Sequence, residues 1–271
     1  MARRYSSVLV TGASSGMGKD FALRLLKDGY TVFAAARSID KMADLAKAGA
    51  KVIAMDISKD ADIVAATNQI KEAGGVDVLI NNAGFGQYGP VEDTPIDKAR
   101  YQFEVNLFGL ARITQLLLPD MRARGKGLVI NVSSMGGKIY TPLGAWYHAT
   151  KHALEGWSDC LRLELKPCGI DVVIIEPGLI DTGFGEGVQD QFAVSKDSAY
   201  SDLASALANS FEAGDTSMSP PSVITDLVVH AIRTPRPKTR YAGGALARPS
   251  MFLRWLLPDR WFDGMLMRQL K

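Results

Sequence analysis

Short apolar segments alternate with longer segments of helical periodicity along most of the chain, and this alternation restricts the fold more than any other feature of the sequence. The apolar segments are almost continuously hydrophobic, which is typical of strands in a parallel sheet covered on both faces. They span residues 7–11, 31–36, 51–55, 76–81, 127–132 and 170–175, and the helical segments span 18–27, 40–48, 60–72, 97–124 and 147–166. With a further short strand near 239–242, the pattern predicts a doubly wound α/β fold of Rossmann type, in which helices flank a parallel sheet of about seven strands.

The chain, residues 1–271, is expected to form a single domain, since no linker, repeat or change of composition interrupts the alternation before Pro177. The stretch 183–221 is rich in Gly, Ser, Ala and Asp and has no clear strand. So long an irregular segment in a compact domain usually covers a functional site. We therefore expect a substrate-binding loop or lid there, followed by a helix near 222–233.

A glycine-rich turn joins the first predicted strand to the first predicted helix. It reads Thr11-Gly12-Ala13-Ser14-Ser15-Gly16-Met17-Gly18. Glycines allow the tight turn and the close approach of a pyrophosphate, and the helix N-terminus offers it free N–H groups. The spacing departs from the general G-x-G-x-x-G pattern, but the strand before it and the helix after it favour a dinucleotide site. The residues expected to hold the dinucleotide are Gly12, Ser14, Ser15, Gly16, Met17 and Gly18.

The end of the second predicted strand bears on the choice of dinucleotide. An acidic side chain there would bind a ribose 2′-hydroxyl, whereas an arginine accommodates a 2′-phosphate. The sequence has Ala36-Arg37-Ser38 at this point and no acid. A guanidinium is always charged and matches the geometry of a phosphate. Arg37 therefore predicts NADP(H) as the cofactor.

Tyr147 and Lys151 lie four residues apart in a predicted helix and so share one of its faces. A nearby ammonium, with the positive nicotinamide of an oxidised cofactor, would lower the pKa of the phenol and make it an acid or base for a carbonyl or an alcohol. Ser133 and Ser134 follow the strand 127–132 directly. A serine hydroxyl there could donate a hydrogen bond to a substrate oxygen on which negative charge develops.

These motifs together resemble those of the short-chain dehydrogenases/reductases. The shared motifs are Thr11–Gly18, Asn81-Asn82-Ala83-Gly84, Ser134, Tyr147-x-x-x-Lys151 and Pro177-Gly178, and the likeness covers about residues 5–185. Within the family the sequence looks like the NADP(H)-dependent hydroxysteroid and retinol dehydrogenase members. The resemblance implies an enzyme that oxidises or forms CH–OH groups.

The resemblance also implies roles for single residues. It selects Ser134 over Ser133, gives Lys151 the ribose of the nicotinamide, and gives Asn106 a helix-disturbing position in a proton relay to the lysine. Asp56 and Ile57 would flank the adenine, and Asn82, Ala83 and Gly84 would pass beneath the cofactor. The remaining cofactor contacts are Tyr147, Pro177, Gly178, Ile180 and Thr182. Since the family pairs its two long helices across two-fold axes, a homo-oligomer, dimer or tetramer, is expected.

The segments after the strands should wall the substrate pocket, and they are mostly apolar or aromatic. We expect Phe85, Leu143, Trp146 and Phe184 to contact the substrate, a small apolar secondary alcohol or ketone. Two alternatives remain: a 3-ketoacyl thioester reductase, which would want a basic patch for an acidic carrier, and a non-catalytic NADP-binding sensor or scaffold. The intact set of Ser134, Tyr147, Lys151 and Asn106 argues against the second.

Other classes of function find no support in the sequence. Lysine and arginine number 31 against 29 acidic residues, which gives no basic footprint for nucleic acid. His148 and His152 have no third ligand nearby and lack the glutamate of H-E-x-x-H, so no metal site is predicted. No segment approaches a membrane span of about 20 apolar residues, and the absence of a secretory signal predicts a cytoplasmic protein.

The C-terminal extension, about 250–271, is apolar and aromatic with interspersed arginines. Pro258 and Asp259 divide it, which predicts two short amphipathic segments. These could form a flap over the substrate cleft or core, a subunit interface, or a peripheral membrane contact. We favour packing against the cleft and the segment 183–221.

Overall fold

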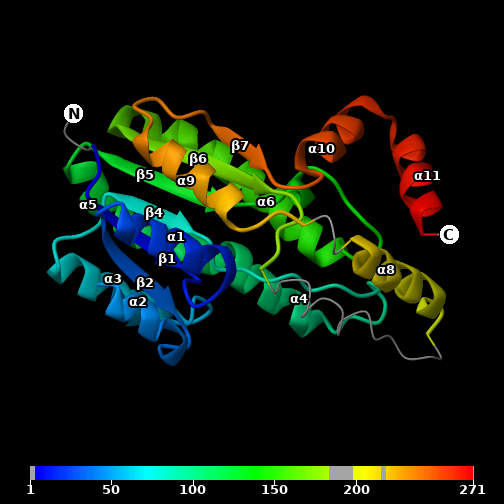
Figure 1. Ribbon diagram of the computed structural model, residues 1–271, viewed down its shortest axis with the longest axis horizontal. Coiled ribbons are helices and arrows are strands. Elements are labelled where there is room, and N and C mark those ends of the chain that lie inside the picture. The colour runs from blue at the N-terminus through cyan, green and yellow to red at the C-terminus, as the bar shows by residue number, and fades with distance from the viewer. Residues whose placement is uncertain (1–3, 183–197, 215–217, 271) are drawn as a thin grey trace.

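The predicted Rossmann-type fold is confirmed by a computed structural model, which describes residues 4–182, 198–214 and 218–270 (Figure 1). A single parallel sheet of seven strands, in the order β3-β2-β1-β4-β5-β6-β7, forms its centre. The strands are β1 (Ser7–Thr11), β2 (Thr31–Ala36), β3 (Lys51–Ala54), β4 (Val78–Asn81), β5 (Gly127–Val132), β6 (Ile170–Pro177) and β7 (Arg240–Gly243). The bounds of β1, β2 and β5 match the predicted segments, and those of the other strands differ by one or two residues.

The strand order reverses beside β1. Val8 pairs with Val32 of β2 on one side and with Val78 of β4 on the other. Because the chain runs outward through β2 and β3 and then returns to β4, the connections that follow β1 and β4 lead to opposite faces of the sheet. This is the point at which open α/β sheets leave a crevice for a ligand.

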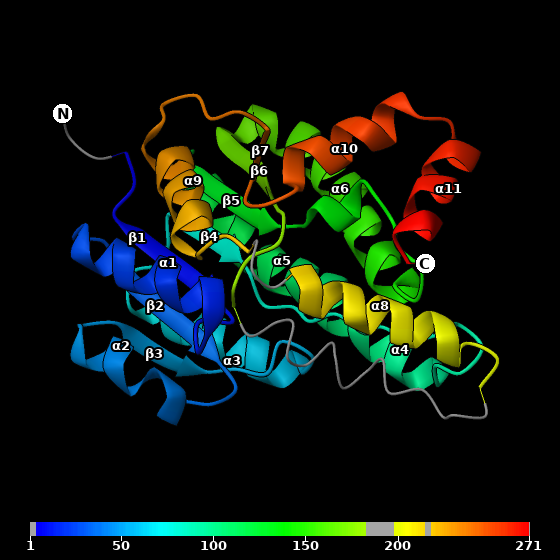
Figure 2. The ribbon, with the colours of Figure 1, turned by 45° about the vertical axis from the view of Figure 1, so that its right-hand side comes forward.

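Helices cover both faces of the sheet (Figures 1 and 2). One face carries α1 (Gly16–Lys27), α2 (Ala43–Lys47), which follows a short turn η1 (Asp40–Met42), and α9 (Ser222–Arg233); the other carries α3 (Asp60–Glu72), α5 (Leu110–Ala123) and α6 (Ala145–Leu165). Each face has its own core. Phe21 and Leu25 lie fully buried in the first, and Ile113 and Leu117 in the second. Burial of about 25 cal/mol for each Å² of apolar surface makes these two cores the main source of stability.

The predicted helix 97–124 is not continuous. It consists of α4 (Ile96–Phe103), a π-helical segment η2 (Glu104–Gly109) and α5. Gly109 packs directly on the loop after β3, where a Cβ would lie 2.0 Å from the carbonyl oxygen of Ile57. Only glycine permits so close an approach of helix and backbone.

The segment predicted to be irregular contains one helix, α8 (Ser201–Gly214), while residues 183–197 and 215–217 lie outside the described part of the chain. The two predicted C-terminal segments are confirmed as α10 (Ala247–Leu256) and α11 (Asp259–Gln269), separated at Pro258. The remaining short turns are η3 (Met135–Gly137) and η4 (Lys166–Cys168). Of the helices described, none combines the length and apolar character that crossing a bilayer requires.

Candidate active site

A cavity of about 570 Å³ opens at the carboxyl ends of β1, β2, β3 and β4, where the strand order reverses. The structure brings twelve of the predicted cofactor residues to its wall: Gly12, Ser14, Ser15, Gly16, Met17, Arg37, Asp56, Ile57, Asn82, Ala83, Gly84 and Thr182. Gly18 is not among them. Its contribution is packing, because a Cβ at this position would lie 2.4 Å from the carbonyl oxygen of Gly12.

The glycine turn is shaped by backbone conformation and fixed by the neighbouring loop. Gly12 and Gly16 have φ angles of +67° and +53°, which few other residues adopt. The Thr11 hydroxyl accepts hydrogen bonds from the backbone N–H groups of Asn82 and Ala83, each at 3.0 Å. The Asn82 side-chain amide donates to the carbonyl oxygen of Thr11 at 3.0 Å. The loops after β1 and β4 are therefore held together beneath the cavity before any ligand binds.

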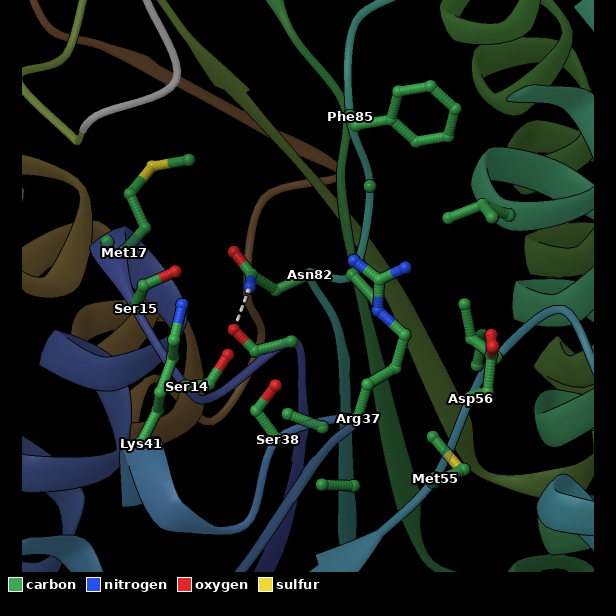
Figure 3. Close-up of a pocket in the computed structure, with 18 of the residues that line it drawn as sticks. Ser14, Ser15, Met17, Arg37, Ser38, Lys41, Met55, Asp56, Asn82 and Phe85 are labelled. Atoms are coloured by element: carbon green, nitrogen blue, oxygen red, sulfur yellow. Dashed lines mark hydrogen bonds between the residues drawn. The ribbon is translucent and has the colours of Figure 1, made fainter. Parts of the chain in front are cut away.

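Basic and hydroxyl groups gather at the β2 end of the cavity. Arg37, Ser38 and Lys41 line it, and in the view of Figure 3 Ser14 and Ser38 lie between the two basic side chains. The Arg37 guanidinium donates to the Tyr101 hydroxyl at 3.4 Å and is otherwise exposed. Lys41 was not predicted. The sequence signal for it was a lysine in the first turn of the helix that follows Arg37.

Asp56 is ionised in the wall of the same cavity. Burial opposes its charge, but hydrogen bonds from the backbone N–H and hydroxyl of Ser58, at 3.0 and 2.7 Å, together with the positive charge of Arg37, hold the pKa of the carboxyl below its usual value. The carboxylate thus accepts hydrogen bonds within its own loop.

A second cavity of about 190 Å³ continues from the first. The two share Met17, Asn82, Gly84, Phe85 and Thr182. The second is lined by the predicted Ser134, Tyr147, Lys151, Pro177, Gly178 and Ile180, and by Tyr88, Ile139, His148, Leu179 and Met218. The candidate catalytic residues therefore lie at the inner end of the candidate cofactor site.

Tyr147 and Lys151 are both buried on the same face of α6. The Lys151 ammonium donates to the carbonyl oxygen of Val132 at 3.0 Å and lies 6.0 Å from the centre of the Tyr147 ring. Burial lowers the pKa of Lys151 to about 8, opposed by the charge of Glu155. Burial also raises the pKa of Tyr147, opposed by a hydrogen bond with Ser134. The chain's own groups therefore do not lower the pKa of the Tyr147 phenol as expected. Burial raises it, and the Lys151 ammonium is hydrogen-bonded to the backbone of Val132.

The two candidate serines differ in environment. Ser134 is half-buried and its hydroxyl accepts from the N–H of Gly136 at 2.9 Å. It also interacts with the Tyr147 phenol. The Ser133 hydroxyl is fully buried and has no hydrogen-bond partner among the described residues. The geometry thus favours Ser134 as the hydroxyl beside the tyrosine.

Asn106 sits in the π-helical segment, so the expected disturbance of the helix is present. Its side-chain oxygen accepts from the N–H of Phe85 at 3.1 Å, and its amide donates to the carbonyl oxygen of Phe85 at 2.9 Å and to the Thr150 hydroxyl at 3.1 Å. Asn106 therefore fixes the loop after β4 to α6. Its role in a proton relay stays a prediction.

The predicted substrate residues separate in the structure. Phe85 lines both cavities. Leu143 is buried in a small apolar cluster with Tyr88, Tyr147 and Leu207 of α8. It lies beside the second cavity and is not among the described residues of its wall. Trp146 is half-buried and also absent from that wall. Phe184 lies outside the described residues.

His148 contributes a neutral imidazole to the second cavity. Its Nε2 accepts from the N–H of Thr141 at 3.0 Å, so Nδ1 carries the proton and donates to the carbonyl oxygen of Gly136 at 2.9 Å. Burial lowers the pKa of the ring. In the described parts of the chain no three histidine, cysteine or acidic side chains come together as a metal site.

Comparisons with known proteins agree with this geometry. The family described as short chain dehydrogenase matches residues 6–192. A probable short-chain type dehydrogenase/reductase VdlC of Helicobacter pylori is 35% identical over 267 residues, which cover 95% of each chain. An NADPH-dependent 3-dehydrocapnine reductase of Ornithobacterium rhinotracheale is 30% identical over 97% of this chain and 96% of that protein.

A solved structure is similar along almost the whole chain. The short-chain dehydrogenase from Streptomyces avermitilis superposes with a TM-score of 0.82 at 33% identity, covering 99% of this chain and 97% of the other. The likeness thus includes the C-terminal helices as well as the sheet.

Proposed function

This chain belongs to the short-chain dehydrogenase family, and on that premise we propose that it is an NADP(H)-dependent oxidoreductase that acts on a ketone or secondary alcohol of an apolar molecule. One observation carries the proposal. The cavity with Ser134, Tyr147 and Lys151 continues directly into the larger cavity that ends at Arg37. A dinucleotide that spans both would place its nicotinamide at the tyrosine and its adenosine ribose at the arginine.

The preference for NADP(H) rests on charge at the end of β2. Arg37 and Lys41 are cationic, Ser14 and Ser38 offer hydroxyl groups, and none of the three residues that follow the strand, Arg37, Ser38 and Ile39, is acidic. This set suits a 2′-phosphate and leaves a 2′-hydroxyl without the acidic partner that NAD-binding folds provide. The relative from O. rhinotracheale is NADPH-dependent by name, which supports the same choice.

The side chains fit a proton transfer coupled to hydride transfer. Bound NADPH would supply the hydride to the carbonyl carbon. The Tyr147 phenol donates its proton to the carbonyl oxygen, and the Ser134 hydroxyl donates a hydrogen bond to that oxygen as negative charge develops on it. Lys151 would hold the ribose of the bound cofactor, and its positive charge would help to stabilise the phenolate that remains. In the reverse direction the phenolate takes the proton of the alcohol.

The character of the substrate follows from the wall of the second cavity. Ile139, Leu179, Ile180 and Met218 supply apolar surface, and Lys151 is the one cationic side chain among the described lining residues. A substrate phosphate or carboxylate would therefore lack a partner. This favours an apolar ketone or alcohol over a thioester carried by an acidic protein, the alternative that would need basic groups at the entrance.

A non-catalytic sensor or scaffold is the alternative from another class. It would need the fold and the cofactor cavity but not the hydroxyl, phenol and ammonium that surround the inner cavity. The presence of Ser134, Tyr147 and Lys151 together favours turnover. We also propose a cytoplasmic homo-oligomer, dimer or tetramer, in which the helices α5 and α6 pair as in the family; light scattering on the purified chain tests the assembly.

The experiment that tests the function is a panel of ketones followed by the loss of NADPH absorbance. We expect turnover of apolar ketones with NADPH at least tenfold faster than with NADH at equal subsaturating cofactor concentration. A ketone with a charged group beside the carbonyl serves as the control substrate and should be slow. Tight NADPH binding without turnover of any ketone or alcohol would favour the sensor.

A further inference from the structure

The outer corner between α10 and α11 carries large apolar side chains that no part of the described chain covers. Phe252, Trp255 and Leu256 are exposed to 57%, 78% and 54%, and Trp261 is exposed to 72%. These residues flank the turn Leu257–Pro258, which Figures 1 and 2 both place at the periphery of the molecule, away from the sheet. We define Phe252, Trp255, Leu256 and Trp261 as the corner patch. Two tryptophans this exposed in one place are unusual on a water-facing surface.

The inner face of the same two helices is firmly packed. Phe262 is 1% exposed and packs edge-on against Tyr140, with ring centres 5.4 Å apart. The Tyr140 hydroxyl donates to Asp263 at 2.8 Å, and the Arg254 guanidinium lies over both rings. The outward aromatic groups thus sit on a fixed support, and their exposure is not the result of a helix lacking a partner.

The exposed charges of α10 and α11 are unbalanced. Arg248, Arg260 and Arg268 are exposed. The two carboxylates of these helices already accept hydrogen bonds: Asp259 from Arg254 at 2.7 Å, and Asp263 from the Tyr140 hydroxyl. Among the described residues, Arg260 and Arg268 have no ion-pair partner. The surface therefore offers aromatic groups and cations together.

We propose that the corner patch docks on the surface of an anionic lipid membrane, with Trp255 and Trp261 in the headgroup region and Arg248, Arg260 and Arg268 against the lipid phosphates. Tryptophan favours the interface because its ring is apolar and its N–H is polar. Exposed arginines add attraction to an anionic leaflet. The helices lie on the membrane in this arrangement and do not cross it.

Charge selects a lipid surface over a second copy of the chain. In a two-fold contact the patch would meet a copy of itself, so both sides would carry the same excess of arginines. Like charges brought together oppose association. The two carboxylates of α10 and α11 already have partners in their own chain, Arg254 and Tyr140. A layer of anionic headgroups supplies the complementary charge.

The position of the patch relates it to the catalytic cavity. Tyr140, on which α11 packs, lies between Ile139 and Thr141, and both of these line the inner cavity. Leu270, at the end of α11, packs on the cluster that contains Tyr88 and Tyr147. Docking at the corner would therefore bring the wall of the cavity close to the bilayer, from which an apolar substrate could enter.

Sedimentation of the full chain with vesicles tests the proposal independently of enzyme activity. We expect binding to vesicles of phosphatidylcholine with phosphatidylglycerol, weaker binding to phosphatidylcholine alone, and weakening by salt. The double variant Trp255→Ser/Trp261→Ser should bind at least tenfold more weakly. Val91→Ser is the matched control, because Val91 is exposed to 59% in the turn before α4, whose Glu92 and Asp93 bond Tyr200 and Ser198 and not the helices of the corner patch.

A charge variant keeps the test valid if the tryptophan variant is unstable. Arg260→Glu/Arg268→Glu, with unchanged circular dichroism and melting temperature, should lose most of the preference for phosphatidylglycerol. The proposal is overturned if the wild type ignores both kinds of vesicle, or if the control weakens binding as much as the tryptophan variant. Dissociation of an oligomer by the tryptophan variant, without vesicle binding by the wild type, would overturn it in favour of a contact between copies.

Discussion

Replacing Arg37 by alanine should weaken NADPH binding about tenfold and leave NADH binding unchanged. A hydrogen bond to a charged group contributes about 1.5–3 kcal/mol. Arg37 is exposed at the rim of the cofactor cavity, so solvent screening places its contribution at the lower end of that range. About 1.4 kcal/mol corresponds to a tenfold change in affinity. The weak contact with Tyr101, at 3.4 Å, leaves the guanidinium available to a phosphate.

Arg37→Asp extends the same reasoning. The new carboxylate would repel a 2′-phosphate and could accept from a 2′-hydroxyl, so the preference should move towards NADH. Lys41 stays at the cavity in this variant and keeps part of the attraction for the phosphate. We therefore expect a loss of NADPH affinity beyond that of the alanine variant, together with a gain for NADH.

Titration of the quenching of protein fluorescence by NADPH and by NADH measures both affinities in each variant. Arg100→Ala is the matched control, because Arg100 is an exposed arginine beside Tyr101 that pairs with Asp97 and does not line the cavity. It should change neither affinity. Equal losses for NADPH and NADH in Arg37→Ala would refute the phosphate contact, as would a wild type that binds both equally.

Two further predictions concern Tyr147 and Glu176. Tyr147→Phe keeps the buried ring and removes the proton donor, so turnover should fall about 10²- to 10⁴-fold while NADPH affinity stays unchanged; steady-state rates and fluorescence titration check this, and activity within tenfold of the wild type would assign the proton to another group. Burial raises the pKa of Glu176 from 4.5 to about 7. Between these pH values the folded chain holds a proton on Glu176 that the unfolded chain has released, so the free energy of unfolding should fall as pH rises from 4.5 to 7. Glu176→Gln should flatten that decline in a series of melting temperatures, and an unaltered slope would contradict the assignment.

Much of the fold was predictable because apolar periodicity reports burial on both faces of a sheet. The strands β1, β2 and β5 coincide with the predicted segments, and helices α3 and α9 do so as well. The break in the helix before α5 was not visible as a change of period. At the end of the π-helical segment Gly109 packs on the carbonyl of Ile57, a contact between residues 52 positions apart that no local pattern shows.

The positions of the predicted substrate residues depend on packing that no local pattern shows, and their contact with a substrate stays a prediction. α6 starts at Ala145, so Trp146 lies about 100° around the axis from Tyr147 and does not reach the described wall of the catalytic cavity. Leu143 precedes the helix and packs beneath α8, which no local pattern could place. His148 lines the cavity as a neutral hydrogen-bonded ring.

The spacing of Tyr147 and Lys151 predicted that they share a helix face, but not the balance of charge between them, because that balance depends on burial. Burial acts on both groups in the same sense: it favours the neutral phenol and lowers the pKa of the ammonium to about 8. The phenol therefore keeps its proton at neutral pH, ready to donate it to a carbonyl oxygen. Oxidation of an alcohol needs the phenolate, which requires positive charge beyond what Lys151 supplies while it is bonded to Val132. Reduction of a ketone leaves the same phenolate, so both directions of the reaction depend on positive charge near Tyr147.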